Sequence, residues 1–307
     1  MWKRSLPLLL ISVPIIAFLG CGSQGDTNGI EEETHALPND LNSTETNTTD
    51  SQEENLTETT PIVVTWYQPD PATTWQWQLT ETLNTSYDVE LYDIDLYNTS
   101  TETIEQLHHE GRKVICYFSA GSYENWRQDA IDFPEEALGN ILDGWENERW
   151  LDIRDERVQS IMQAHLDLAV HKGCDGVEPD NVDAYLHASG FELTALDQQA
   201  YNIFLATEAH DRNLSIGLKN DLQQIEVLEP YFDFAINEQC YFYQECDTLQ
   251  PFIEANKAVF NVEYANKYVN NVRGERDRIC QTSRDNTIRT LVLPQTLDDT
   301  FRYSCDE

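Results

Sequence analysis

The stretch GCDGVEPDNVD, residues 173–183, decides how the rest of this sequence is interpreted. It follows residues 154–173, whose apolar positions recur at helical spacing. Acidic residues and proline are poor strand formers, yet four acids and a proline stand where the next strand of an alternating pattern is due. Such a strand would end in Glu178, Asp180 and Asn181. The stretch therefore predicts a strand whose polar side chains gather at its carboxyl end.

Short apolar runs of the same kind recur along the chain after Pro61. Eight of them begin at Ile62, Tyr87, Lys113, Gly173, Leu214, Phe232, Ala258 and Ile288. Several lack strict apolar–polar alternation, as expected for parallel strands covered on both faces. Helices are predicted between them at residues 154–173, 195–211, 221–228 and 248–256. This alternation predicts an α/β fold with a single (β/α)8 TIM barrel. A doubly wound open sheet is the alternative, although no glycine-rich phosphate loop follows the first run.

The composition restricts the class of partner. The chain has 307 residues with 19 Lys and Arg against 55 Asp and Glu, a formal net charge of −36. A surface that binds nucleic acid needs an excess of basic residues, so that class is excluded. An exported or salt-tolerant protein is the plain explanation for this charge. The alternative is an acidic cleft that attracts a cationic ligand.

The first 60 residues indicate export. Residues 1–20 combine two early positive charges with an apolar run, as a secretory signal does. They end in Leu-Gly before Cys21, which resembles a bacterial lipobox and predicts lipidation of Cys21. An ordinary signal peptide is the alternative. Residues 21–60 lack Lys and Arg and read as an acidic linker that cannot bury enough surface to fold. We therefore expect a membrane-anchored lipoprotein at the cell surface or in the periplasm, with its folded domain at residues 61–307.

Six cysteines follow Cys21, and an even number in an exported protein predicts up to three disulfides. Six cysteines permit about fifteen pairings, so the sequence does not fix them. The plausible closures are Cys240 with Cys246 and Cys280 with Cys305, which would leave Cys116 for Cys174. The competing interpretation, a metal site, lacks paired Cys-x-x-Cys spacing and a histidine cluster. No metal and no cofactor are predicted.

Polar residues recur where the predicted strands end. They are Tyr67 and Gln68, Asp93 and Asp95, Tyr117 and Ser119, Glu178, Asp180 and Asn181, Lys219 and Asn220, Asn237 and Glu238, and Glu263 and Tyr264. Any one of them could be a solvated strand end or a helix cap. Their recurrence over seven strands favours a site at the barrel mouth, where TIM-barrel chemistry occurs. Asp180 and Glu238 would face each other there, as the two carboxyl groups of a glycoside hydrolase do. Trp66, Tyr67, Tyr117, Tyr241 and Tyr264 would offer faces for sugar rings.

Six motifs then resemble, in this order, glycoside hydrolase family 114, the endo-α-1,4-polygalactosaminidases. They are WYQP at 66–69, CYFSAGSYENWR at 116–127, GCDGVEPDNVD, GLKND at 217–221, NEQC at 237–240 and NVEY at 261–264. The resemblance covers roughly residues 61–302. It implies a (β/α)8 barrel that cleaves partly de-N-acetylated α-1,4-galactosamine polymers of microbial biofilm matrices by a retaining mechanism.

The resemblance also implies roles for individual residues. The family's nucleophile falls on Asp180 and its acid/base on Glu238. Its cleft would be lined by Tyr67, Asp93, Tyr117, Lys219 and Asn237. Asp93, Glu178 and Glu263 are the candidates to contact substrate ammonium groups, while Lys219 is placed to keep Asp180 ionised.

Two further hypotheses stay open at this point. One is a non-catalytic carbohydrate-binding surface lipoprotein on the same barrel, which an acidic linker and an aromatic rim fit equally well. The other keeps the enzyme but changes the sugar to another α-galactoside or amino sugar. Cleavage of a galactosamine polymer, and comparison of its acetylated and de-acetylated forms, would separate the three.

Overall fold

The computed structural model describes residues 64–306. The predicted signal peptide, Cys21 and the linker at 21–60 lie outside these residues. The strands are β1 Trp75–Gln78, β2 Leu91–Asp95, β3 Lys113–Ser119, β4 Ser122–Glu124, β5 Leu138–Leu142, β6 Trp145–Leu151, β7 Gly176–Asp180, β8 Ser215–Lys219, β9 Phe234–Glu238, β10 Ala258–Glu263, β11 Ile288–Val292 and β12 Tyr303–Ser304.

The α-helices are α1 Thr101–His109, α2 Glu156–Lys172, α3 Ala195–His210, α4 Ile225–Leu228, α5 Cys240–Tyr243, α6 Gln250–Glu254, α7 Asn266–Val269 and α8 Glu275–Asp285. Short 3-10 turns lie at Ala130–Asp132, Glu135–Ala137, Ala184–Leu186, Leu222–Gln224, Glu229–Tyr231, Cys246–Leu249 and Val272–Gly274. Within residues 64–306, no helix is both long and apolar enough to span a bilayer.

The main sheet is a curled parallel barrel. Its order is β1-β2-β3-β7-β8-β9-β10-β11-β12, and every pair in it except β11 with β12 is parallel. β12 occupies the edge of β11 on the side of β1. The two ends of the sheet then meet through Trp75, whose indole N–H donates to Arg289 O at 3.1 Å, and through Leu79 N, which donates to Leu297 O. The predicted TIM-barrel class is confirmed.

Seven of the eight predicted strands are present, but the first one was placed wrongly. The barrel begins at β1, and Val64–Tyr67 are not strand. Trp66 instead stacks on His210, with ring centroids 4.1 Å apart, and donates to Asp233 at 2.8 Å. The run that begins at Ile62 is rich in strand formers, but its described part lies beside residues that precede β8 and β9. It covers the floor of the barrel, at the amino ends of the strands.

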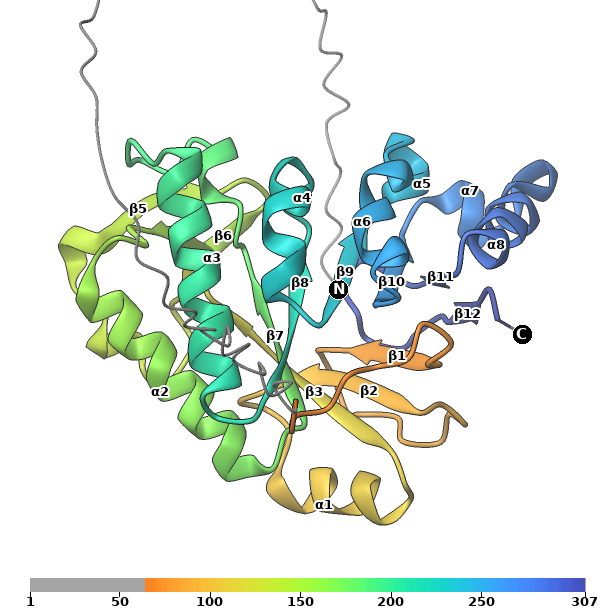
Figure 1. The fold of residues 1–307 in the computed structure, drawn as a ribbon, viewed down its shortest axis with the longest axis horizontal. Helices are drawn as coiled ribbons and strands as arrows, with labels where there is room; N and C mark the ends of the chain where they lie inside the picture. Colours follow the sequence, from red (N-terminus) through yellow and green to blue (C-terminus); the bar gives the residue numbers. More distant parts are fainter. Residues whose placement is uncertain (1–63, 307) are drawn as a thin grey trace, which may run out of the picture. The chain divides into compact units, whose positions relative to one another are not determined.

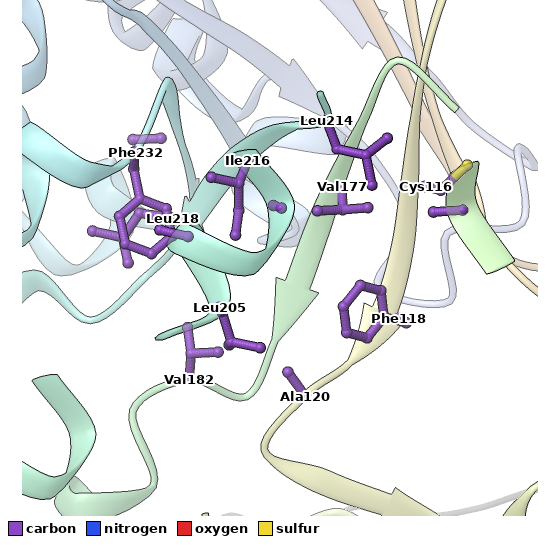
Figure 2. Close-up of a cluster of buried hydrophobic side chains, with 14 of the residues drawn as sticks. Cys116, Phe118, Ala120, Val177, Val182, Leu205, Leu214, Ile216, Leu218 and Phe232 are labelled. Atoms are coloured by element: carbon purple, nitrogen blue, oxygen red, sulfur yellow. The ribbon is translucent and has the colours of Figure 1, made fainter. Parts of the chain in front are cut away.

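Two apolar layers hold the barrel together. Inside, Trp75, Ile115, Phe234 and Phe260 fill the floor, and Trp77 lies above them at the base of the mouth. Alternation of side chains along each strand turns the next residues outward, toward the helices. Figure 2 shows Cys116 and Phe118 of β3, Val177 of β7, and Ile216 and Leu218 of β8 on this outer face. The filled floor leaves only the carboxyl ends of the strands open for a site.

The two long helices were predicted and are confirmed. α2 begins after Asp155, whose side chain accepts from Arg157 N, and ends at Gly173 with a left-handed φ of 88°. α3 begins with a capping box in which Thr194 and Asp197 bond each other's backbone N–H. α2 and α3 lie outside β7 and β8 (Figure 1).

A small sheet inserted between β3 and α2 was not predicted. It has the antiparallel order β4-β6-β5 and lies beyond the carboxyl end of β3 (Figure 1). Because it follows Ser119 directly, it extends the wall of the barrel mouth. Its residues enter the site described below.

Three disulfides are formed, as the even cysteine count predicted. They join Cys116 to Cys174, Cys240 to Cys246 and Cys280 to Cys305. The first ties β3 to the start of the β7 segment across 58 residues, whereas the second closes a loop of 6 residues.

This difference in loop length predicts a difference in stabilisation. Chain entropy gives about 4 kcal/mol for the long closure and about 2 kcal/mol for the short one. The double variant Cys116→Ala/Cys174→Ala should therefore lose more unfolding free energy in urea titrations than Cys240→Ala/Cys246→Ala. The short pair is a matched control because one cysteine of each pair is fully buried and the other is 7% or 9% exposed. An equal or reversed order of losses would contradict this account.

Candidate active site

Lys219 stands at the centre of the barrel mouth. It is the last residue of β8 and points inward, in the same alternation as Gly217. Its Nζ lies 3.0 Å from Asp180 Oδ1, 3.1 Å from Glu178 Oε1 and 3.5 Å from Glu238 Oε2. Only 2% of the side chain is exposed. One buried ammonium group therefore joins carboxylates from β7 and β9, the two strands that flank β8.

The charge state of Lys219 follows from these contacts. Burial alone would lower the pKa of its ammonium group. Asp180, Glu238 and Glu178 outweigh that effect and raise the pKa well above its usual value. The lysine is thus a permanent cation, and its Nζ also lies 4.8 Å from the ring centroid of Trp77.

Asp180 is held by a second donor from the adjacent strand. Tyr117 donates its hydroxyl to Asp180 Oδ2 at 3.2 Å. The register of β3 on β7, with Ser119 opposite Asp180, sets this contact. Burial, followed by the charge of Asp180, raises the pKa of Tyr117 well above its usual value. Tyr117 therefore remains a hydrogen-bond donor that fixes the carboxylate.

Glu238 has its own set of donors. Tyr264 donates to Oε1 at 2.5 Å, and Asn220 Nδ2 donates to Oε2 at 3.2 Å. Asn220 is positioned in turn, because its Oδ1 accepts from Glu238 N at 3.0 Å and from Asn237 Nδ2 at 3.2 Å. Burial and then Glu238 raise the pKa of Tyr264 well above its usual value. Both oxygens of Glu238 are consequently fixed at the mouth.

Two more acids lie beneath this layer. Asp93 and Glu178 are 1% and 0% exposed, and neither lines the cavity described next. Burial raises the pKa of Glu178 to about 7, with Lys219 opposing the rise. Burial and then Glu178 raise the pKa of Asp93 well above its usual value. The pair therefore carries a proton near neutral pH and cannot reach a substrate. This corrects the prediction that Asp93 and Glu178 contact substrate amines.

Three other predicted site residues lie elsewhere. Tyr67 is on the floor, with its ring centroid 5.3 Å from Lys113 Nζ at the start of β3, because the first strand was misplaced. Glu263 points outward from β10 and accepts from Tyr241 N at 2.8 Å. Asn237 also points outward and acts only through Asn220. Strand alternation explains why Asn237 and Glu263 point outward, since their neighbours Glu238 and Val262 take the inward positions.

An open cavity of about 610 Å³ lies over Asp180, Lys219 and Glu238. One wall is formed by residues 79–80 and 295–297. The other comes mainly from the inserted sheet and the loop after β7, with Glu124, Trp126, Asp143, Trp145, Glu148, Trp150, Asp183 and His187. Sequence analysis missed this wall, although two Trp residues within GWENERW, residues 144–150, were a signal. Among residues 64–306, no group of three or more His, Cys, Asp or Glu side chains could hold a metal ion.

Removing Lys219 should destabilise the domain in a pH-dependent way. Loss of one partner from a buried ion pair costs about 3–5 kcal/mol, so Lys219→Met should lower the unfolding free energy by that order at pH 7.5. The loss should shrink at pH 5, because Glu178 already takes up a proton at about pH 7 and a protonated acid needs no cation.

Urea titrations at the two pH values measure this. Lys113→Met is the control, since Lys113 pairs with Asp175 but is 45% exposed. It should lose less than about 1 kcal/mol at either pH. A loss in Lys219→Met that is the same at both pH values would contradict the charge argument.

A parallel barrel that presents two fixed carboxyl groups in an open cavity at its mouth is the architecture of a glycoside hydrolase. The chain belongs to glycoside-hydrolase family GH114, whose family model matches residues 57–307. The resemblance found in the sequence is thereby confirmed, and the protein is a glycoside hydrolase.

Solved structures agree with this assignment. Ega3 of Aspergillus fumigatus, determined in complex with galactosamine, is 42% identical with a TM-score of 0.74, and the match covers 78% of this chain and 97% of that one. The glycoside hydrolase domain of PelA from Pseudomonas aeruginosa is 10% identical with a TM-score of 0.60, covering 75% of this chain and 98% of that one, which shows a shared fold. A comparison with curated proteins gives no match.

Proposed function

We propose that this protein is an endo-acting hydrolase of α-1,4-linked, partly de-acetylated galactosamine polymer, with retention of anomeric configuration. Asp180 is the nucleophile and Glu238 the acid/base. The observation that carries the proposal is that both carboxylates reach one ammonium group, that of Lys219, beneath an open cavity.

The shared lysine limits the distance between the two acids. Because Asp180 Oδ1 is 3.0 Å and Glu238 Oε2 is 3.5 Å from the same nitrogen, these oxygens are at most about 6.5 Å apart. Retaining glycosidases place their carboxyl groups about 5–5.5 Å apart, and inverting ones about 6.5–9.5 Å. The limit favours retention, since it leaves little room for a water molecule between acid and sugar.

The chemistry then proceeds in two displacements. The reactive form has Glu238 protonated and Asp180 ionised. Glu238 gives that proton to the glycosidic oxygen while an oxygen of Asp180 attacks the anomeric carbon, so the leaving chain departs with the proton. Glu238, now a carboxylate, takes a proton from water, and the water oxygen displaces Asp180 from the sugar. Tyr117 and Lys219 hold Asp180 in place, and Tyr264 and Asn220 hold Glu238.

The charge of the cavity supports a cationic substrate. Besides Asp180 and Glu238, its lining contains Asp95, Glu124, Asp143, Glu148 and Asp183 against Arg127 and Lys219. Free amines on a galactosamine polymer would be attracted into such a field. The Ega3 structure, which is 42% identical, contains galactosamine. A purely binding protein would not need two acids with separate sets of donors.

We also propose that the enzyme is exported and anchored through Cys21 at a cell surface or in the periplasm. Thr65 and Trp66 lie on the barrel floor, where Thr65 donates to Asn213 and Trp66 to Asp233. The first described residues therefore lie at the end of the barrel opposite the cavity.

Substitution of the two acids tests the catalytic assignment. Asp180→Asn and Glu238→Gln should each reduce release of shortened chains from galactosamine polymer by more than about 10³-fold, since each removes a covalent or proton-transfer step. Binding of the polymer should persist. Asp211→Asn and Glu226→Gln, both exposed and outside the cavity, are the matched controls. Full activity in either active-site variant would rule out the assignment.

The stereochemistry of the product is a separate prediction. Proton NMR during hydrolysis should show the α-anomer at each newly formed reducing end before mutarotation, because two displacements restore the original configuration. First appearance of the β-anomer would instead mean a single displacement by water and would remove the nucleophile role from Asp180.

A further inference from the structure

Glu148 of β6 is a cavity-lining acid that the proposed reaction does not use. It is 6% exposed. Its Oε2 accepts from Ser122 Oγ at 2.7 Å, while its Oε1 has no hydrogen-bond partner among residues 64–306. Its Oε1 is not among the fully buried unpartnered atoms of the described residues, so this oxygen is open to the cavity.

The cation that acts on Glu148 from within the described residues, Arg127, is already committed. Arg127 donates to both oxygens of Asp95, at 3.0 and 2.7 Å, and to both oxygens of Glu124, at 3.0 and 2.7 Å. Within the described residues, Glu148 makes no ion pair. Burial, Glu124 and Asp180 raise its pKa to about 7, against the lowering effects of Ser122 and Arg127. Glu148 is thus an acid whose counter-charge the folded chain does not supply.

Aromatic faces line the same cavity. Trp126 is 50% and Trp145 is 53% exposed, although large apolar side chains gain free energy when covered. Trp150, by contrast, is buried and stacks on His187 at 4.8 Å. The two open indoles offer flat apolar surface to a sugar ring, and Glu148 offers a negative charge to a substituent on it.

Hydrogen bonds tie Glu148 to the segment that carries the nucleophile. Ser122, which donates to Glu148, also lies 2.6 Å from Ser119 Oγ. Asn181, the residue after Asp180, donates to both serines at 2.9 and 3.2 Å. Gly121 makes the close approach possible, because a Cβ there would lie 1.7 Å from Asn181 O. The free oxygen of Glu148 is therefore held at a fixed place relative to Asp180.

We propose that Glu148, together with the exposed indoles of Trp126 and Trp145, forms a subsite for the free ammonium group of a galactosamine unit beside the one that Asp180 attacks. This inference rests on the proposed function and deepens it. The subsite selects units without an N-acetyl group, because an acetamide brings no charge to the buried carboxylate. The inserted sheet, rather than the barrel itself, would then set the preference for de-acetylated polymer.

The test measures binding without turnover. In a Glu238→Gln background, calorimetry gives the Kd of an α-1,4-linked galactosamine tetrasaccharide and of its fully N-acetylated form. Adding Glu148→Gln should weaken binding of the amine form by about 10–100-fold, as expected for a charge-assisted hydrogen bond, and leave the acetylated form nearly unchanged. Glu146→Gln is the matched control, since Glu146 is exposed on the same strand and does not line the cavity.

Two readouts separate this role from a structural one. A structural role for Glu148 would weaken both oligosaccharides equally, and that result would overturn the subsite. With Glu148 present, affinity for the amine form should fall as pH drops below about 7, because Glu148 takes up a proton. Glu148→Gln should remove this part of the pH dependence, although Glu124 and Asp180 still face the site. If the Glu238→Gln protein binds neither oligosaccharide, the proposed function itself is wrong. If it binds both and Glu148→Gln leaves the ratio of the two Kd values unchanged, only the subsite is wrong.

Discussion

The whole mouth of the barrel depends on one buried ammonium group. Glu178, Asp180 and Glu238 arrive from two strands on either side of β8, and three carboxylates this close would repel one another at neutral pH. Lys219 lets them coexist. β8 can deliver it because Gly217, the previous inward residue, leaves space for the ring of Phe234, which a Cβ would approach to 2.4 Å. The catalytic geometry thus begins with the packing of the layer below it.

That lower layer also sets the strength of the electrostatics. Trp75, Trp77 and Phe260 exclude water from the floor, and charges interact more strongly where solvent does not screen them. The same burial would impose a large desolvation cost on two further ionised acids. Asp93 and Glu178 avoid this cost by holding a proton, as their raised pKa values indicate. The interior of the barrel therefore has three layers. An apolar floor is followed by the partly protonated pair Asp93 and Glu178, and the charged groups of the mouth lie above them.

Elements of the fold could be predicted from the sequence where a local periodicity marks them. Seven strands, α2 and α3 were recovered because their apolar spacing and caps are local signals. β1 was missed because WQWQ, residues 75–78, is only 4 residues long and half polar, whereas the run at Ile62 has a stronger apolar signal but covers the floor. Glu263 and Asn237 were assigned to the site because position at a strand end was counted and facing was not. Two-residue alternation counted from Glu238 and Tyr264 would have excluded both. The inserted sheet has polar, irregular strands, and only its tryptophans marked it.

The position of Lys219 also constrains how a cationic polymer can lie in the cavity. A substrate ammonium about 4 Å from the lysine would meet repulsion of about 4 kcal/mol at an effective dielectric constant of 20. The ion pairs of Lys219 with Asp180 and Glu238 oppose that repulsion, so a free amine is tolerated near the lysine only on the side where these carboxylates lie. The wall that contains Glu148 and Asp183 adds negative charge and favours a free amine there. The proposed preference for de-acetylated units would therefore rest on the acidic wall and on these carboxylates, not on the lysine.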